Sequence, residues 1–393
     1  SCRTQLNVGF SEDEEKRLRE YLTGLKGMVA GRFLWQLGSK TVDKHGLASL
    51  QNCAVTAVDN PIRPFVWAFD MLMLGSGVGY NIQREYVYKM PPTIDKDISV
   101  TRKDTKDADF IVPDSREGWT ELLERVLKAY FHTGKSFSYS TMLVRGRGAP
   151  IKGFGGVASG PEDLCWGIEK ITDILKARRG KQLRPIDCLD IMNIVGYIVV
   201  SGNVRRSAQI AIGDIDDLQF LNAKRWDLGN IPNWRAMSNN SVVCNDVNLL
   251  PDQFWQGYLG NGEPYGLINL KLARNTGRLA DGEKYQDKNI VGFNPCAEQS
   301  LEDKETCCLA EIFLPNIASK SELMDVATML YRINKHSLRL QCHHEDTESV
   351  VHRNMRMGIG VTGYLQATEE QRLWLSETYE PVSYTHLTLP TIL

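Results

Sequence analysis

The segment from residue 294 to residue 311, NPCAEQSLEDKETCCLAE, gathers side chains that could perform redox and acid–base chemistry. Pro295 favours an extended conformation for the residue before it, and alternate residues of an extended segment point to the same side. Asn294, Cys296 and Glu298 are therefore expected to share one face. Such a face offers an amide that can orient a hydroxyl, a thiol that can react, and a carboxylate that can accept a proton.

The cysteines of this segment do not have the spacing of a metal site. Cys307 and Cys308 follow Cys296 by eleven and twelve positions, which matches no standard zinc pattern. The run CHHE at 342–345 contains metal-binding residue types, but adjacent ligands rarely converge on one ion, so no metal site is assigned. The residues alone also allow a second interpretation, in which Cys296 is a buried, apolar-like thiol and Glu298 a surface acid.

Composition and charge narrow the class of protein. The chain has 393 residues, of which 42% are apolar and 24% charged, and its net charge is -2. These values are typical of a soluble globular protein, and the near-neutral charge gives no electrostatic footprint for nucleic acid or an anionic membrane. No apolar run approaches the roughly 20 residues of a membrane span. Nine scattered cysteines indicate reduced thiols, and we expect a cytoplasmic location.

Helical and extended patterns alternate along the chain and predict an α/β fold. Capping boxes of Ser11 with Glu14 and of Asp114 with Glu117 predict the starts of two helices, the second running to about residue 131. The polar residues 90–110 contain two prolines and are expected to form an exposed insertion or loop. Further helices are predicted over 161–180 and 184–203, and strands over 204–214 and 237–245.

Three glycine-containing segments suggest backbone contacts, but none is a dinucleotide-binding fingerprint. In LMLGSGVGYNIQ, residues 72–83, Tyr80 stands where that fingerprint requires its third glycine. In IKGFGGVASGP, the glycines after Lys152 form either a loop that can approach phosphate or a tight turn. In SGNVRRSA, Arg205 is suited to bind phosphate or carboxylate, although a single surface arginine is commonly just solvated.

Taken together, these segments resemble the catalytic chains of ribonucleotide reductases, in particular the monomeric adenosylcobalamin-dependent (class II) ribonucleoside-triphosphate reductases. The resemblance extends over residues 28–366 and rests on segments that occur in the family's order: LQNCAVTAVDNP, MLMLGSGVGYNIQ, VPDSREGW, IKGFGGVASGP, SGNVRRSA, MSNNSV, NPCAE with CCLAEI, and NMRMGIGVTGY. It implies a ten-stranded α/β barrel, here without its C-terminal part, and a finger loop whose tip carries a radical cysteine.

The resemblance also implies roles for five residues. Cys296 would form a thiyl radical and remove the 3′-hydrogen of the ribose, Glu298 would deprotonate the 3′-hydroxyl, and Asn294 would hydrogen-bond the sugar. Cys53 and Cys307 would be the dithiol that gives two electrons as the 2′-hydroxyl leaves as water. A dry, enclosed site suits such chemistry, and the oxidised pair would need re-reduction by a thioredoxin-like protein.

The cofactor and ligands follow from the same resemblance. It implies adenosylcobalamin, a ribonucleoside triphosphate substrate and a deoxynucleotide effector, bound by a monomer that has no nucleic-acid or membrane partner. Lys152 and Arg205 would connect the effector site to the substrate base, and Asp114 and Ser115 would lie at a helix start within an effector-site insertion at about 85–135. The residues alone do not distinguish a diphosphate from a triphosphate substrate.

The expected domains are an N-terminal helical segment over 1–48 and a partial barrel over 49–380. Residues 381–393 include PVSYTHLTLPT, which resembles the translation of a sequencing adapter, so we expect them not to belong to the native chain. A chain that lacks the second part of the barrel is expected to be inactive by itself.

Two departures from the family pattern leave questions open. Cys308 stands where the family usually has asparagine, so it could substitute for Cys307 or interfere with it, and Ala297 stands where glycine is common. Two alternative functions also remain. One is the large chain of an oxygen-dependent, metal-cofactor (class I) ribonucleoside-diphosphate reductase, and the other is a glycyl-radical enzyme on the same barrel.

Overall fold

The computed structural model describes residues 4–151, 157–201, 208–259, 265–276 and 286–388. The chain divides into two compact units, a smaller one of Ser1–Asn52 with Thr306–Leu393 and a larger one of Cys53–Glu305. No helix in the described residues combines the length and the hydropathy needed to cross a bilayer.

The larger unit is built on a sheet of parallel strands in the order β2-β3-β7-β8-β9. The strands are β2 (Cys53–Ala57), β3 (Gly77–Asn81), β7 (Gln209–Asp214), β8 (Asn239–Val243) and β9 (Gly266–Ile268). Every residue of β2 and β3 is buried. This is the behaviour of central strands that are covered on both faces, as parallel sheets require.

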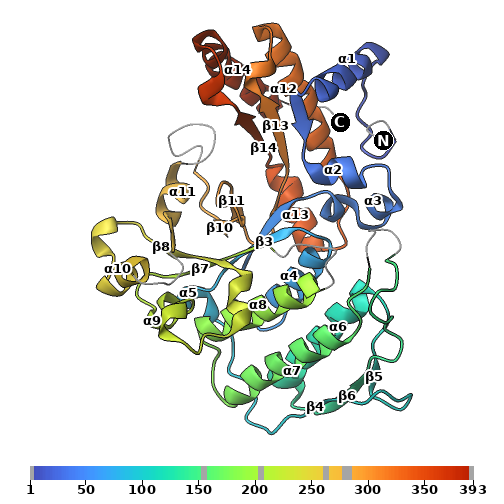
Figure 1. Cartoon of the computed structure of the whole chain (residues 1–393), viewed down its shortest axis with the longest axis vertical. Coiled ribbons are helices and arrows are strands. Elements are labelled where there is room, and N and C mark those ends of the chain that lie inside the picture. The colour runs from blue at the N-terminus through green and yellow to red at the C-terminus, as the bar shows by residue number, and fades with distance from the viewer. Residues whose placement is uncertain (1–3, 152–156, 202–207, 260–264, 277–285, 389–393) are drawn as a thin grey trace. The chain divides into compact units, whose positions relative to one another are not determined.

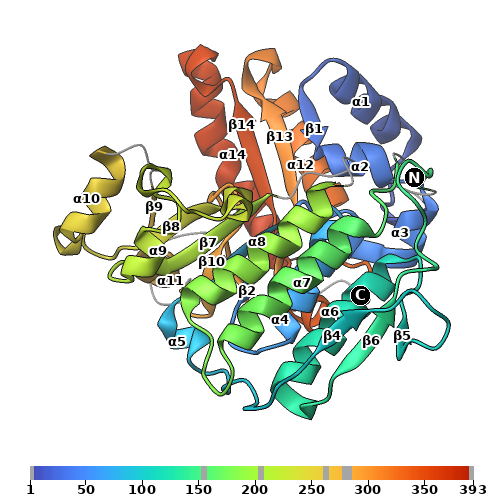
Figure 2. The ribbon, with the colours of Figure 1, turned by 60° about the horizontal axis from the view of Figure 1, so that its bottom comes forward.

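Helices α4 (Arg63–Met73) and α8 (Pro185–Ser201) pack against this sheet, and α7 (Glu162–Ala177) packs against α8. Figure 2 shows α7 and α8 side by side. Gln209 Nε2 donates a hydrogen bond of 3.0 Å to the carbonyl oxygen of Met192, which ties β7 to α8. The predicted helices over 161–180 and 184–203 are confirmed, as are the strands predicted within 204–214 and 237–245. The α/β alternation read from the sequence is therefore confirmed.

The residues between β3 and α7 in the sequence form a second, smaller sheet. Its strands β4 (Val100–Arg102), β5 (Phe110–Ile111) and β6 (Phe137–Ser140) run parallel in the order β4-β6-β5, and α6 (Arg116–Lys128) continues into a π-helical turn (Ala129–Thr133). The prediction of a loop over 90–110 was therefore wrong in part. β4 forms because it pairs with β6, and a polar sequence read locally does not reveal such a distant partner.

The start of α6 also differs from the prediction. The N-cap is Ser115, whose hydroxyl accepts a 3.0 Å hydrogen bond from the amide of Gly118. Asp114 is one residue too early to cap the helix and instead accepts from Arg145 Nε at 2.7 Å. The predicted capping box of Asp114 with Glu117 is therefore wrong, and Ser115 performs the capping.

Short elements complete the larger unit. They are α5 (Arg84–Val87), α9 (Leu218–Leu221), η3 (Trp226–Leu228), η4 (Asn233–Met237), η5 (Val247–Leu249), α10 (Asp252–Leu259) and α11 (Leu270–Thr276). The antiparallel hairpin of β10 (Ile290–Phe293) and β11 (Ser300–Glu302) follows them.

The β10–β11 hairpin lies against β2 and β3, and Figure 1 shows it beside β3. Two glycines of β3 permit this approach: a Cβ atom on Gly77 would lie 2.9 Å from Pro295 Cγ, and one on Gly79 would overlap the carbonyl oxygen of Phe293. Asn81 Nδ2 donates to the carbonyl oxygen of Val291 at 2.7 Å. The glycines of residues 72–83 therefore serve backbone packing.

The smaller unit contains a three-stranded sheet of β1 (Gly27–Val29), β13 (Leu309–Phe313) and β14 (Gly358–Thr362) in the order β1-β13-β14. Helix α12 (Lys320–Ser337) lies along this sheet (Figure 1). The predicted capping box of α1 (Glu12–Thr23) is confirmed, because Ser11 and Glu14 exchange hydrogen bonds of 2.8 and 3.2 Å. The other elements are α2 (Gly31–Gln36), α3 (Lys40–His45), η1 (Gly46–Ser49), β12 (Thr306–Cys307), η7 (Leu314–Asn316), α13 (Glu345–Asn354), η8 (Tyr364–Gln366) and α14 (Glu369–Thr388).

The packing of the hairpin on β3 predicts that Gly79→Ala destabilises the protein. The added methyl group meets backbone, which cannot rotate away, so we expect the free energy of unfolding to fall by about 1–3 kcal/mol or more. Gly146→Ala is the matched control, because a Cβ there has no heavy atom within 4 Å. Urea unfolding of both variants measures the difference, and equal stability of the two would contradict the packing described.

Candidate active site

The turn between β10 and β11 carries the cysteine-containing segment singled out in the sequence. The backbone of Asn294 donates to the carbonyl oxygen of Gln299 at 3.0 Å, and its side-chain oxygen accepts from the amide of Gln299 at 3.0 Å. Ala297 donates to the carbonyl oxygen of Asn294 at 2.8 Å and has a φ of 62°. The chain therefore turns here, and the prediction of an extended segment over 294–298 was wrong. Asn294 can bridge the turn because its side chain and backbone both reach Gln299.

The turn still brings the predicted side chains together. Asn294 Nδ2 donates to Glu298 Oε1 at 2.5 Å, and Asn294 itself is fully buried. Cys296 and Glu298 are exposed. The shared face that was expected from strand alternation is thus produced by a turn, in which the buried amide holds the carboxylate and the thiol lies on the surface of the larger unit.

The environment of Cys296 favours the protonated thiol. Partial burial raises its pKa, and the charges of Glu298 and Cys53 add to this effect. A thiol that keeps its proton is a poor nucleophile at neutral pH but retains the S–H hydrogen that a radical reaction would remove. The site is thus better suited to hydrogen-atom chemistry than to attack by a thiolate.

Cys53 is the first residue of β2, opposite Gly77 of β3 in the register of the sheet. Its side chain is buried, and it lies close enough to Cys296 to affect the pKa of that thiol. Gly77 in turn contacts Pro295 of the turn. The structure therefore brings Cys53, Cys296, Glu298 and Asn294 together at the amino-terminal ends of β2 and β3.

A buried lysine that was missed in the sequence lies at the carboxyl-terminal end of β2, away from Cys53. Lys304 is buried and has a φ of 62°. Its ammonium group donates to Thr56 Oγ1 at 2.8 Å and to the two oxygens of Asp303 at 2.9 and 3.0 Å. Asp303 also accepts from the amide of Ala57 at 2.8 Å. These bonds fix the exit of the hairpin to β2, and the only sequence signal was the cluster of charges at 302–305.

Cys307 ends β12 of the smaller unit and is fully buried. It thus belongs to a different unit from Cys53 and Cys296. Its participation with them in one site stays a prediction.

Cys308 has a structural environment of its own within the smaller unit. Its sulfur lies 3.2 Å from Asn334 Oδ1 and 3.4 Å from Ser337 Oγ, both on α12. Burial raises the pKa of this thiol to about 12, so it is protonated at neutral pH. Because consecutive residues of an extended segment point to opposite sides, Cys307 and Cys308 face different surroundings. Cys308 therefore packs against α12.

Two of the four residues expected in the effector site and its link to the substrate base lie in the described part of the chain. Ser115 caps α6, and Asp114 pairs with Arg145, as described above. Lys152 and Arg205 lie outside the described residues. The metal-like run at 342–345 contains His343 and His344, whose rings stack with centroids 4.2 Å apart.

The exposure and raised pKa of Cys296 predict its reactivity toward iodoacetamide. Among the described cysteines it is the exposed one, so we expect it to be alkylated first in the folded chain. The rate should rise about tenfold per pH unit and continue to rise above the usual pKa of cysteine, because the raised pKa delays thiolate formation. Peptide mass spectrometry measures this, with the fully buried Cys188 as the slow control. Rapid labelling of Cys188 or a plateau of the Cys296 rate below pH 8 would contradict the environment described.

The chain is similar to known proteins over most of its length. Residues 88–176 match the insertion domain of B12-dependent ribonucleotide reductases. The adenosylcobalamin-dependent ribonucleoside-triphosphate reductase of Euglena gracilis is 34% identical over 383 residues, which are 94% of this chain and 50% of that protein. The enzyme of the same name from Lactobacillus acidophilus is 34% identical over 89% of this chain and 54% of its own length.

A solved structure gives the same assignment. The crystal structure of a B12-dependent (class II) ribonucleotide reductase superimposes with a TM-score of 0.78 at 28% identity, over 91% of this chain and 58% of that one. The chain thus spans about half the length of the curated relatives it matches. Sequence, insertion and fold agree, and the chain belongs to the B12-dependent (class II) ribonucleotide reductases, of whose chains it covers about half.

Proposed function

We propose that the complete protein reduces ribonucleoside triphosphates to 2′-deoxyribonucleotides by thiyl-radical chemistry. The observation that carries this proposal is the turn at 294–299, which presents the protonated thiol of Cys296 beside the carboxylate of Glu298 and near Cys53. The names of the relatives support the substrate class, since both are ribonucleoside-triphosphate reductases.

Adenosylcobalamin is the proposed cofactor, and the site fits it in one respect. A radical can be passed to a cysteine only if the thiol is reduced, protonated and accessible, and Cys296 is all three. When bound, the cofactor would supply the radical that removes the hydrogen atom from this thiol.

The residues of the chain then account for the reduction. The Cys296 thiyl removes the 3′-hydrogen of the ribose and becomes a thiol again, while Glu298 accepts the proton of the 3′-hydroxyl. The 2′-hydroxyl leaves as water. Cys53 and Cys307 together provide two electrons and two protons and become a disulfide, after which the 3′-hydrogen returns from Cys296 to the sugar and the proton returns from Glu298 to the 3′-oxygen. Ribose and dithiol thus yield deoxyribose, water and disulfide, with one thiyl radical at the beginning and the end.

Asn294 has a positioning role in this proposal. Its amide donates to Glu298 at 2.5 Å, while its side-chain oxygen and backbone hold the turn closed. The carboxylate is therefore oriented before the substrate binds, which lowers the entropic cost of placing a base against a hydroxyl. In the complex we expect the same amide to hydrogen-bond the sugar.

The parallel sheet β2-β3-β7-β8-β9 is proposed to be half of a ten-stranded α/β barrel that the rest of the protein completes, with the catalytic part beginning at about residue 49. The hairpin would then be the finger inside the barrel, which would exclude water from the exposed Cys296 and Glu298. The surrounding protein would be a cytoplasmic monomer that a thioredoxin-like protein re-reduces and a deoxynucleotide regulates. Asp114, Ser115, Lys152 and Arg205 are the proposed residues of the regulatory path.

The two alternatives that the sequence left open are not favoured by the relatives. The proteins from Euglena gracilis and Lactobacillus acidophilus are named as adenosylcobalamin-dependent, and the matched insertion is that of B12-dependent enzymes. A class I reductase would turn over without adenosylcobalamin, so omission of the cofactor from an assay separates the two.

The central test is Cys296→Ser in the complete protein. We expect formation of deoxynucleotide from a ribonucleoside triphosphate, with adenosylcobalamin and dithiothreitol, to fall at least about a thousandfold, because the hydroxyl of serine is a far poorer hydrogen-atom donor. Circular dichroism and thermal unfolding should be unchanged, since the side chain is exposed. Turnover that survives this change would eliminate the radical assignment.

The vicinal cysteines give a second, matched test. Cys307→Ser should reduce turnover with a thioredoxin-type reductant by about a thousandfold, because one thiol of the dithiol is lost. Cys308→Ser should retain turnover within about twofold and cost about 1 kcal/mol of stability, since a hydroxyl can still bond Asn334 and Ser337. The reverse pattern would show that Cys308 is the redox residue.

A further inference from the structure

A pocket lies at the carboxyl-terminal ends of the parallel strands of the larger unit. Its volume is about 230 Å³, and it is lined by residues that follow or end four neighbouring strands. Gln83 and Glu85 come after β3, Asp214 ends β7, and Val243 and Asn245 come at and after the end of β8. Leu270, Lys271 and Arg274 on α11 follow β9. In parallel α/β sheets, ligands commonly bind at this end of the strands.

This pocket is separate from the cysteine site. Cys53 and Gly77 begin β2 and β3, and Gly77 is where the turn at 294–299 contacts the sheet. Asn81, at the other end of β3, contacts Val291 near the root of the hairpin. The two sites thus lie at opposite ends of the strands, and the pocket has no role in the chemistry proposed for the thiols.

One wall of the pocket is cationic. Lys271 and Arg274 are three residues apart on α11, which places them on the same face of the helix. Arg274 is held in place, because its Nε donates to the carbonyl oxygen of Ile290 at 2.8 Å and its terminal nitrogen to Tyr86 Oη at 3.3 Å. Lys271 lines the pocket beside Arg274, and its backbone amide donates to Asn245 Oδ1 at 3.2 Å.

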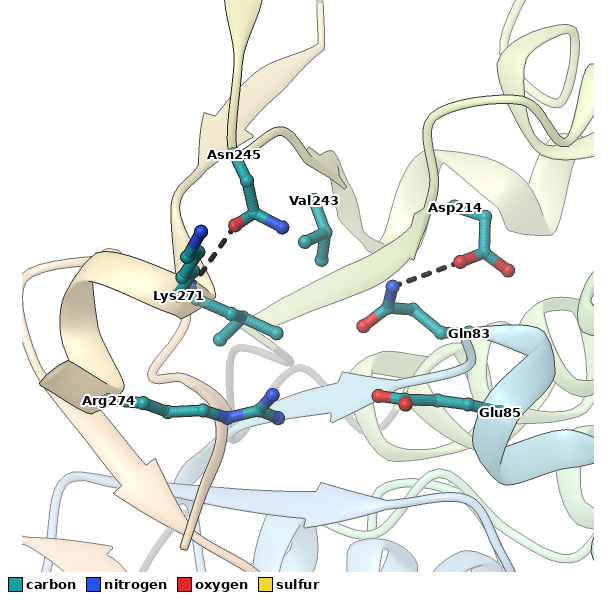
Figure 3. A pocket seen from close by; sticks show the side chains of 8 residues that line it. Gln83, Glu85, Asp214, Val243, Asn245, Lys271 and Arg274 are labelled. Carbon is teal, nitrogen blue, oxygen red and sulfur yellow. Dashed lines mark hydrogen bonds between the residues drawn. The ribbon is translucent and has the colours of Figure 1, made fainter. Parts of the chain in front are cut away.

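The opposite wall is acidic, as Figure 3 shows. Glu85 points toward Arg274 across the pocket without forming an ion pair among the described residues. Asp214 accepts hydrogen bonds from Gln83 Nε2 at 2.9 Å and from Arg84 Nε at 3.0 Å. Its oxygens are therefore engaged within the protein, and it contributes mainly negative charge to this wall. The carboxylate of Glu85 interacts with the hydroxyl of Tyr86 and faces the pocket.

The hydroxyl of Tyr86 lies near a charged group from each wall of the pocket, Glu85 and Arg274. The pKa of this hydroxyl is raised, first by burial and then by the charge of Glu85, whereas Arg274 lowers it. Both charged groups therefore act on the same hydroxyl from the two sides of the pocket. A pocket with a fixed guanidinium on one wall and a carboxylate on the other is suited to a molecule that carries both signs of charge.

We propose that this pocket binds a small zwitterion, such as an amino acid. Lys271 and Arg274 receive its carboxylate, Glu85 receives its ammonium group, and the amide of Asn245 offers a further donor. A simple anion would meet the repulsion of Glu85 and Asp214, and a simple amine would meet the repulsion of Lys271 and Arg274. A molecule with both groups satisfies both walls, and charge-assisted hydrogen bonds of this kind are among the stronger ones in proteins.

The test is isothermal titration calorimetry on the whole chain with an ω-amino acid series of glycine, β-alanine, γ-aminobutyrate and 6-aminohexanoate. Propionate and propylamine carry one charge each and are the matched single-charge probes. We expect at least one member of the series to bind about tenfold more tightly than either single-charge probe, which corresponds to about 1.4 kcal/mol. Binding of propionate as tight as that of every amino acid would reduce the pocket to an anion site and overturn the proposal, as would the absence of binding.

Three variants locate the binding. Lys271→Met and Glu85→Gln should each weaken the best amino acid at least about fivefold, because each removes one charge-assisted contact. Lys288→Met is the control, since Lys288 is exposed and does not line the pocket. Circular dichroism confirms that the variants fold. Equal affinity of all three variants would place the amino acid elsewhere and overturn the proposal.

Discussion

The close approach of the β10–β11 hairpin to β3 is the constraint on which the candidate site depends. Two backbones can come this near only where side chains are absent, and Gly77 and Gly79 provide the space. The carbonyl oxygen of Val291 then reaches Asn81, which fixes the hairpin lengthwise on the strand. Once the hairpin is fixed, the position of its turn follows, and with it the position of Cys296. A larger side chain at Gly77 or Gly79 would displace the hairpin, and the thiol of Cys296 would move with it.

The turn itself shows how one residue serves both structure and chemistry. Asn294 is fully buried and makes hydrogen bonds through its backbone, its side-chain oxygen and its side-chain nitrogen. Only the last of these reaches Glu298, so the same side chain closes the turn and orients the carboxylate. Ala297 adopts a left-handed φ of 62°, which costs a residue with a Cβ roughly 1–2 kcal/mol. This explains physically why glycine is favoured at that position, and the hydrogen bonds of Asn294 offset the cost.

The sequence was sufficient for the parts of the molecule that local patterns determine. The long helices α7 and α8 and the capping box at Ser11 follow from spacing within one segment. The grouping of Asn294 with Glu298 was also expected, but a turn produces it and not the predicted strand alternation. The failures share a different cause. The strand β4 and the fold of the hairpin on β3 depend on partners far away in the chain, and the extended conformation expected near Pro295 gave way to bonds that Asn294 makes to Gln299. Buried charges such as Lys304 were also invisible, because their meaning depends on a neighbouring strand.

The vicinal pair Cys307 and Cys308 illustrates why residue type alone does not assign chemistry. The two thiols are adjacent in sequence, and both are buried. An extended backbone nevertheless points them in opposite directions, and the helix α12 receives Cys308 with an amide and a hydroxyl. Burial raises the pKa of Cys308 to about 12, so that this thiol can neither attack a disulfide nor release a proton readily. The family usually has asparagine at position 308. An asparagine there could also hydrogen-bond Asn334 and Ser337 of α12. The redox role of Cys307 stays a prediction, whereas the contacts of Cys308 with α12 account for Cys308 as a packed, buried side chain.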